Sequence, residues 1–312
     1  MRRSLVALFA LLCTGCSSTP GPSPSPSAQV IARVDGTAIT ADSFQLRLHS
    51  AQTAVGQAGA PSGNAAMTSQ LRASVLRSLI IDTVIAQEAT ATGVAATDAE
   101  IQAQVDADTS AAGGSAQLQT QLAALGGSMA QLRDEVRSSL NEQKLEDAFA
   151  HQRAVEIEQK LSTGSTFTSL ASQYSDDTDT SAKGGEVGAV ARTTIQNGDP
   201  PYATAVLALT PGQLTNPPIR DAQGYDVVQL EARTATTLTL RHIIVNAPQP
   251  YTVKERPSWF SVAIFETLAT DCSSGQIHVY IGDVGDDPCA AVSSSASPSP
   301  AAGRAAPSTP TP

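Results

Sequence analysis

The sequence is poor in aromatic and charged residues. Aromatic side chains make up 4% and charged side chains 15% of its 312 residues, and there is a single tryptophan. Hydrophobic residues nevertheless reach 41%, which is enough to form the cores of two modest domains. Those cores must therefore be built mainly from the aliphatic side chains of Ala, Val, Leu and Ile.

Basic residues are also scarce. Lys and Arg number 19 against 29 Asp and Glu, which leaves a formal net charge of −10 at pH 7. A nucleic-acid-binding surface needs a concentration of Lys and Arg that displaces counterions from the phosphate backbone. The sequence contains no such basic stripe, so we expect no nucleic acid among the partners.

Cysteine occurs only four times, in a pattern unlike a zinc site. After the N-terminal Cys13 and Cys16, the remaining pair, Cys272 and Cys289, is not of the Cys-x-x-Cys type, and His278 between them has no companion ligands. We therefore expect neither a metal nor another cofactor. In an oxidising compartment Cys272 and Cys289 are candidates for a disulfide, with two free thiols as the alternative.

The N-terminus has the parts of an export signal. Arg2-Arg3 is followed by the apolar run Leu5–Leu12 and then by Thr14-Gly15-Cys16. This order is similar to a bacterial lipoprotein signal, in which the cysteine at the position of Cys16 is lipidated. The resemblance implies an extracytoplasmic protein, lipid-anchored to the bacterial cell membrane, with residues 1–16 as signal peptide. Cys13 stands where an aliphatic residue is usual, so plain secretion or an uncleaved anchor is the alternative.

Two low-complexity segments flank the part of the chain that can fold. Residues 17–28 and 293–312 are rich in Pro and Ser and cannot bury a core. We expect the first to be a tether and the second a disordered tail. Between them, no apolar run approaches the roughly 20 residues that a membrane-spanning helix needs.

Residues 29–145 are predicted to be mostly helical. Alternating residues in 30–40 around Asp35-Gly36 predict a hairpin, and apolar residues at three- and four-residue spacing in 67–90 predict a long helix. Thr97-Asp98-Ala99-Glu100 is a capping box for the next helix. This series resembles the N-terminal region of SurA/PrsA-type extracytoplasmic foldases, which implies a helical, client-holding domain.

Residues 146–247 resemble a second domain type. Thr166–Asp177, Ser181–Gly188 and Gly224–Leu230 are similar to the parvulin signature of a helix, a Ser-Asp loop, a double-glycine turn and a final strand. Parvulins are peptidyl-prolyl isomerases with a small antiparallel sheet and helices. The fold class that we expect is therefore α+β, with an N-terminal helical chaperone-like domain followed by a parvulin-like domain.

The parvulin resemblance also implies site residues. The family is thought to use a histidine pair on neighbouring strands, a Cys or Asp in the Ser-Asp loop and an apolar proline pocket. The resemblance assigns Ser175 and Asp177 to the Ser-Asp loop of the catalytic site. It assigns Ile195 and Tyr202 to the proline pocket. Local chemistry alone equally allows Asp177 to be an N-cap or turn carboxylate, and it favours ordinary core packing for Ile195 and Tyr202.

Two departures from the parvulin pattern concern the histidines. Asp226 stands where the family has its second histidine, and a carboxylate cannot act as both donor and acceptor as a neutral imidazole does. The strand that normally opens the domain is missing from its place. A copy of it, Leu240–Val245 with His242, follows the last strand instead.

Two hypotheses explain this displaced strand. Either His242 begins a second, degenerate parvulin repeat, or the domain is circularly permuted. We prefer permutation, because a short connection at 233–236 would let residues 238–245 fold back antiparallel to the final strand at little cost in loop entropy. His242 would then lie beside Asp226, which raises the pKa of the histidine.

The sequence thus predicts a peptidyl-prolyl cis-trans isomerase that assists the folding of exported proteins, with unfolded or proline-containing polypeptides as partners. Asp226 and the displaced strand favour an alternative, a non-catalytic holdase or client-binding adaptor on an inactive parvulin fold. Residues 248–292 carry no assignable motif, and we expect an accessory hairpin there, closed by Cys272 and Cys289.

Overall fold

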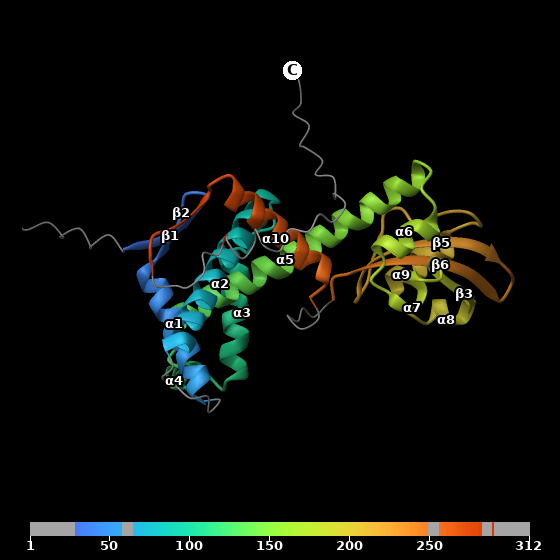
Figure 1. The fold of residues 1–312 in the computed structure, drawn as a ribbon. Helices are drawn as coiled ribbons and strands as arrows, with labels where there is room; N and C mark the ends of the chain where they lie inside the picture. Colours follow the sequence, from blue (N-terminus) through green and yellow to red (C-terminus); the bar gives the residue numbers. More distant parts are fainter. Residues whose placement is uncertain (1–28, 58–64, 249–255, 283–288, 290–312) are drawn as a thin grey trace, which may run out of the picture.

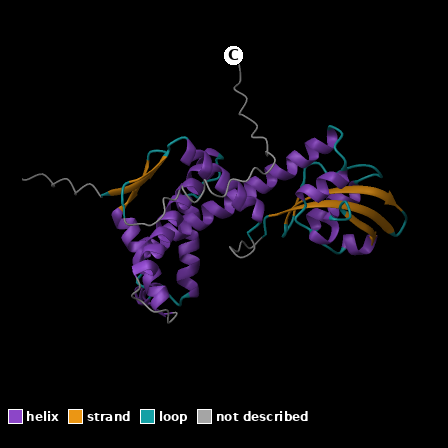
Figure 2. Ribbon diagram, viewed as in Figure 1, coloured by secondary structure: helices purple, strands orange, loops and turns teal. Residues whose placement is uncertain are grey.

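The protein forms two lobes that share one long helix (Figure 1). The computed structural model describes residues 29–57, 65–248, 256–282 and 289. The predictions for the signal peptide with Cys16, the tether and the tail lie outside these residues. Figure 2 shows that strands occur in both lobes, as a small sheet beside the helices of one lobe and as the main sheet of the other.

The helical lobe is built from both ends of the described chain. Its elements are β1 (Val30–Val34), β2 (Thr37–Thr40), α1 (Ala41–Gln57), α2 (Ala65–Ala91), α3 (Asp98–Ala111), α4 (Ser115–Ala124), the first part of α5 (Met129–Ser162), α10 (Ser258–Ser273) and β7 (Ile277–Val279). The predicted hairpin, long helix and capping box are all present in it.

Local sequence explains these element boundaries. Asp35 and Gly36 have φ angles of 42° and 77°, which gives β1 and β2 a tight turn of the Asp-Gly type. The Thr40 hydroxyl accepts a hydrogen bond from the Ser43 N–H at 3.2 Å and so caps α1. At the start of α3, the Thr97 side chain and the Glu100 side chain each accept from the other's backbone N–H.

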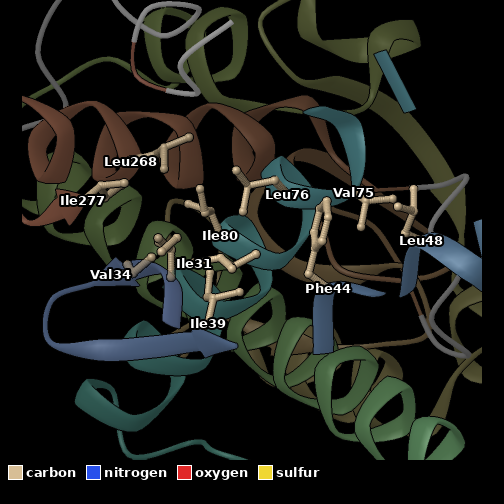
Figure 3. Packing of buried hydrophobic residues seen from close by; sticks show 12 residues of the cluster. Ile31, Val34, Ile39, Phe44, Leu48, Val75, Leu76, Ile80, Leu268 and Ile277 are labelled. Atoms are coloured by element: carbon tan, nitrogen blue, oxygen red, sulfur yellow. The ribbon is translucent and has the colours of Figure 1, made fainter. Parts of the chain in front are cut away.

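The segment after the sheet lobe returns to the helical lobe. β7 pairs antiparallel with β1, so that Val34 lies opposite Ile277 in a sheet of order β2-β1-β7. Leu268 of α10 packs with Phe44 and Ile80 in the core of this lobe (Figure 3). The accessory hairpin expected in 248–292 is therefore wrong: its described part is a helix and a strand that complete the helical lobe.

A disulfide joins Cys272 and Cys289 beside the same core. The two sulfur atoms are 2.08 Å apart, and both residues pack against the cluster that contains Leu268. The bond links the end of α10 to a residue beyond β7.

Helix α5 runs through both lobes. Residues 129–162 form one helix of 34 residues, which the Ser128 side chain caps at its N-terminus. Leu145 packs with Phe260 in the helical lobe, whereas Ala150, Ala154 and Ile157 belong to the core of the sheet lobe. A domain boundary between residues 145 and 146 therefore falls inside a continuous helix.

The sheet lobe contains a four-stranded antiparallel sheet of order β3-β6-β5-β4. Its elements are α6 (Phe167–Tyr174), α7 (Thr178–Ser181), β3 (Glu186–Ala191), α8 (Arg192–Gln196), α9 (Pro200–Ala208), β4 (Ile219–Arg220), β5 (Gly224–Arg233) and β6 (Thr237–Asn246). The displaced strand, β6, lies inside the sheet between β3 and β5. The structure therefore has the arrangement expected of a permuted domain.

The two faces of this sheet carry separate cores. Val227 and Ile243 lie opposite each other in the register and pack with Ala154 of α5 and Leu170 of α6. The alternate residues of β5 and β6 pack against α8 and α9, in a cluster that contains Ile195, Val206, Val228, Leu230, Leu238 and Leu240. Asp226 and His242 lie on this second face, because side chains alternate along a strand.

A buried carboxylate lies where α5 passes between the lobes. Glu146 is 1% exposed, and its Oε2 atom has no hydrogen-bond partner among the described residues. Burial, together with the neighbouring Asp147 charge, raises the pKa of Glu146 to about 7. Because the folded state holds this proton more tightly than the unfolded chain does, stability falls as the pH rises from the ordinary value of about 4.3 to about 7.

We therefore expect Glu146→Gln to stabilise the protein at alkaline pH. At pH 8 its free energy of unfolding should exceed that of the parent by about 1–3 kcal/mol, and near pH 4 the difference should largely vanish. Urea unfolding at both pH values measures this, with the exposed Glu266→Gln as control. An equal effect at both pH values would show that the charge of Glu146 is not the cause.

Candidate active site

The C-terminal half of β6 is covered by the Ser-Asp loop. β3 pairs with β6 only as far as Arg241. Beyond it, the Ile244 N–H donates to the Ser175 hydroxyl at 3.2 Å, and the Asp176 N–H donates to the Ile244 carbonyl at 2.8 Å. The Asn246 N–H donates to Asp176 Oδ2 at 2.8 Å. The loop thus replaces a neighbouring strand and is held in register along β6.

The double-glycine turn brings the chain close to His242. Gly185 has a φ of 82°, and its carbonyl accepts the His242 N–H at 2.9 Å. A Cβ atom at Gly185 would lie 2.5 Å from the His242 carbonyl oxygen and 2.9 Å from the Phe167 ring. Only glycine fits here, both for its backbone angle and for the close approach.

The imidazole of His242 lies between two carboxylates. Its Nε2 atom is 2.8 Å from Asp177 Oδ2, and its Nδ1 atom is 3.5 Å from Asp226 Oδ2. The Thr180 hydroxyl donates to Asp177 Oδ2 and lies 3.1 Å from His242 Nε2. The structure therefore brings together Asp177, Asp226 and His242 from three separate parts of the sequence, and we call them the Asp-His-Asp cluster.

The carboxylates of this cluster differ in their surroundings. Asp226 is 3% exposed, and its Oδ1 atom has no hydrogen-bond partner in the described part of the chain. Burial raises the pKa of Asp226, although the hydrogen bond and the charge of His242 oppose the rise. For Asp177, partial burial opposes ionisation, but hydrogen bonds from Thr180, His242 and the Asp179 N–H outweigh it and lower the pKa.

Both carboxylates favour the charged form of His242. Burial of the ring disfavours the imidazolium, but the hydrogen bonds and charges of Asp226 and Asp177 outweigh this effect and raise the pKa of His242. Since both ring nitrogens face carboxylate oxygens, the arrangement favours an imidazolium between two carboxylates over a neutral imidazole.

The structure gives the remaining predicted site residues different surroundings. Ser175 anchors the loop to β6 through its hydroxyl. Tyr202 of α9 packs on the core beside the cluster, and burial followed by the charges of Asp226 and Asp221 raises its pKa. Ile195 is 6% exposed inside the core, so little of its surface is available to a ligand. Asp177 is also the N-cap of α7, as local chemistry allowed.

Sequence reasoning missed Thr180 as a member of the site. Its hydroxyl contacts both Asp177 and His242 because one turn of α7 separates it from Asp177. The sequence signal that could have identified Thr180 is its position three residues after Asp177, the N-cap aspartate of the helix.

A separate groove of about 720 Å³ runs along α9 and β4. Its lining includes Ala205, Leu209, Leu214 and Ile219, but none of the three residues of the Asp-His-Asp cluster. The groove is therefore distinct from the candidate active site.

Two family models match the chain. The model described as SurA-like N-terminal domain matches residues 4–146, and the model described as PPIC-type PPIASE domain matches residues 136–232. The second match ends before β6, so it contains Asp177 and Asp226 but not His242.

Curated relatives match over shorter segments. The Chaperone SurA of Chromohalobacter salexigens is 37% identical over 30% of this chain and 20% of its own length. The Foldase protein PrsA 2 of Bacillus cereus is 37% identical over 26% of this chain and 27% of its own. The Foldase protein PrsA of Pediococcus pentosaceus is 36% identical over 25% and 26%. The chain thus spans about a fifth to a quarter of the length of the curated relatives that it matches.

One solved structure is aligned over a longer part of the chain. It is the peptidylprolyl isomerase PrsA from Bacillus anthracis, and the alignment covers 66% of this chain and 99% of that one. The sequence identity is 19% and the TM-score is 0.23.

The geometry of the Asp-His-Asp cluster predicts how the pKa of His242 responds to a substitution of Asp226. Asp226→Asn removes the carboxylate that contributes most to the charged imidazole, so the pKa of His242 should fall. The stabilisation from the raised pKa is fully present below about pH 6.5 and is lost as the pH rises through the folded value, so in the variant the stabilisation should be smaller and its loss should be complete at a lower pH. NMR titration of the imidazole resonances measures the change.

The matched control is Asp221→Asn. Asp221 is a nearby carboxylate whose Oδ1 accepts the Gly224 N–H at 3.0 Å and which has no hydrogen bond to His242 among the described contacts. If Asp226→Asn and Asp221→Asn shift the titration equally, the direct Asp226–His242 interaction is not responsible.

Proposed function

We propose that this chain, which combines the two domains of a SurA/PrsA-type parvulin foldase, is an extracytoplasmic folding factor that catalyses peptidyl-prolyl cis-trans isomerisation in exported polypeptides. The observation that carries the proposal is the Asp-His-Asp cluster on the sheet of the PPIC-type domain. Unfolded, proline-containing segments are the substrates, because a folded chain rarely exposes such a bond in extended form.

The reaction needs an electrostatic environment rather than a nucleophile. Rotation about an Xaa-Pro bond must overcome amide resonance, a barrier of roughly 18–20 kcal/mol. The planar amide carries negative charge on its oxygen and positive charge on its nitrogen, and this separation decreases as the bond twists. Carboxylates beside the carbonyl oxygen therefore disfavour the planar state relative to the twisted one.

One observation favours a second function, a non-catalytic holdase. Both ring nitrogens of His242 are already engaged, by Asp177 and Asp226, so neither is free to contact a substrate in this arrangement. In that case the sheet lobe binds proline-containing segments, and the helical lobe shields them from aggregation.

Proline isomerisation measured in a protease-coupled peptide assay separates these two functions. We expect His242→Ala and Asp177→Asn to lower kcat/KM about tenfold or more, because each removes part of the charge pattern at the site. The matched controls are His278→Ala on β7 and Asp179→Asn, both exposed, which should retain parental activity. A parent that suppresses client aggregation but does not accelerate isomerisation would establish the holdase instead.

We also place the protein outside the cytoplasmic membrane, attached through a lipid on Cys16. Support comes from the order of the basic, apolar and small residues before Cys16 and from the SurA and PrsA names of its relatives. Within the described residues, no helix has the length and apolar character to cross a membrane.

Lipid attachment predicts different behaviour for the two N-terminal cysteines. In cells fed a radiolabelled fatty acid, Cys16→Ser should abolish labelling and release the protein from the membrane fraction, whereas Cys13→Ser should keep both. The reason is that only the cysteine at the end of the signal becomes the modified N-terminus. Persistent labelling of Cys16→Ser would rule out Cys16 as the lipidated residue.

A further inference from the structure

Trp259, the single tryptophan of the chain, contacts the cores of both lobes. It stands at the start of α10, next to Phe260, which is fully buried against the helical lobe with Leu145 and Ile85. The Trp259 ring packs against this cluster and also against the sheet-lobe core that contains Ala150 and Tyr225. A movement of the helical lobe relative to the sheet lobe would therefore displace the Trp259 side chain.

The polar edge of the same ring reaches the Ser-Asp loop. The Trp259 indole N–H donates to Asp176 Oδ2 at 3.0 Å. The same carboxylate oxygen accepts the Asn246 N–H, so Asp176 is held simultaneously by β6 and by α10. A hydrogen bond to a charged acceptor in a partly buried position is stronger than one between neutral groups.

Arg153 of α5 completes this contact. Its guanidinium carbon lies 4.6 Å from the centre of the Tyr174 ring and 5.8 Å from that of Trp259. Burial raises the pKa of Asp176, and the hydrogen bonds from Asn246 and Trp259 and the charge of Arg153 oppose this rise. We call Arg153, Tyr174, Asp176 and Trp259 the junction cluster, because they come from α5, α10 and the loop at the junction of the lobes.

The junction cluster adjoins the Asp-His-Asp cluster directly in sequence. Asp176 precedes Asp177, whose Oδ2 atom is 2.8 Å from His242 Nε2. A hydrogen bond requires a donor–acceptor distance of about 2.7–3.2 Å and weakens steeply when its angle falls below about 120°. Because Asp176 and Asp177 are consecutive, a displacement of Asp176 would change the geometry of the contact between Asp177 and His242.

We propose that Trp259 is a positioning residue of the isomerase site: its indole N–H ties the Ser-Asp loop to the helical lobe and so holds Asp177 against His242. The expected effect on catalysis rests on the isomerase function proposed above. The positioning of Asp177 by Trp259 does not depend on that function. Through this bond, a client that shifts the helical lobe changes the geometry of the site.

Trp259→Phe tests the proposal in the full chain, because it removes the N–H donor and keeps an aromatic ring. The matched control is Phe265→Leu, a half-exposed aromatic residue on the same helix. NMR titration of the His242 imidazole is the first readout, and the kcat and KM of peptide isomerisation are the second. Asp176→Asn weakens the same hydrogen bond from the loop side and serves if Trp259→Phe does not fold.

We expect Trp259→Phe to lower the pKa of His242 and to reduce kcat about three- to tenfold with little change in KM, since only the arrangement of the site is altered. Phe265→Leu should change neither. If the His242 titration of Trp259→Phe matches that of the control, Trp259 does not position the site. A parent without isomerase activity would refute the proposed function alone, because the titration still decides whether Trp259 positions Asp177.

Discussion

The antiparallel pairing of β5 with β6 is the interaction on which the candidate site depends. In its register Val228 lies opposite His242 and Asp226 lies opposite Ile244, so Asp226 and His242 are diagonal neighbours on one face. A slip of one residue would turn His242 to the other face and place Ile243 in the site. The register is fixed because each face of the pair is buried in its own core, which a slip would expose.

The order of the elements in the sheet lobe explains how the two lobes are connected. The chain enters the sheet lobe along α5 and leaves it at the end of β6, from which it returns to α10 and β7 in the helical lobe. Entry and exit thus lie at the same end of the sheet lobe, beside the Ser-Asp loop. This arrangement is what allows a residue of the returning segment, Trp259, to reach Asp176.

Much of this structure is predictable from local sequence signals, and the remainder depends on distant contacts. The Asp35-Gly36 turn and the Thr97 capping box determine the conformation of their own neighbourhood, and the strand carrying His242 is recognisable by its residues. β7, by contrast, has three residues and acquires its conformation only by pairing with β1 at the other end of the chain. For α5, the lack of Gly and Pro in 129–162 agrees with one continuous helix, but no residue in it marks where one lobe ends.

Substitution of a histidine by Asp226 changes the physics of the site without making isomerisation impossible. A neutral histidine pair can exchange tautomers, whereas here both ring nitrogens of His242 face carboxylates, which raise its pKa and favour its charged form. Rotation about a prolyl bond requires no net proton transfer, so loss of tautomer exchange removes nothing that the reaction needs. The reaction needs an electric field from the site residues that stays fixed while the amide twists. A buried network of charged side chains resists reorientation more strongly than neutral dipoles do. Preorganisation of that field therefore depends on the contacts that hold Asp177 in place, from Thr180 within the loop to Trp259 in the other lobe.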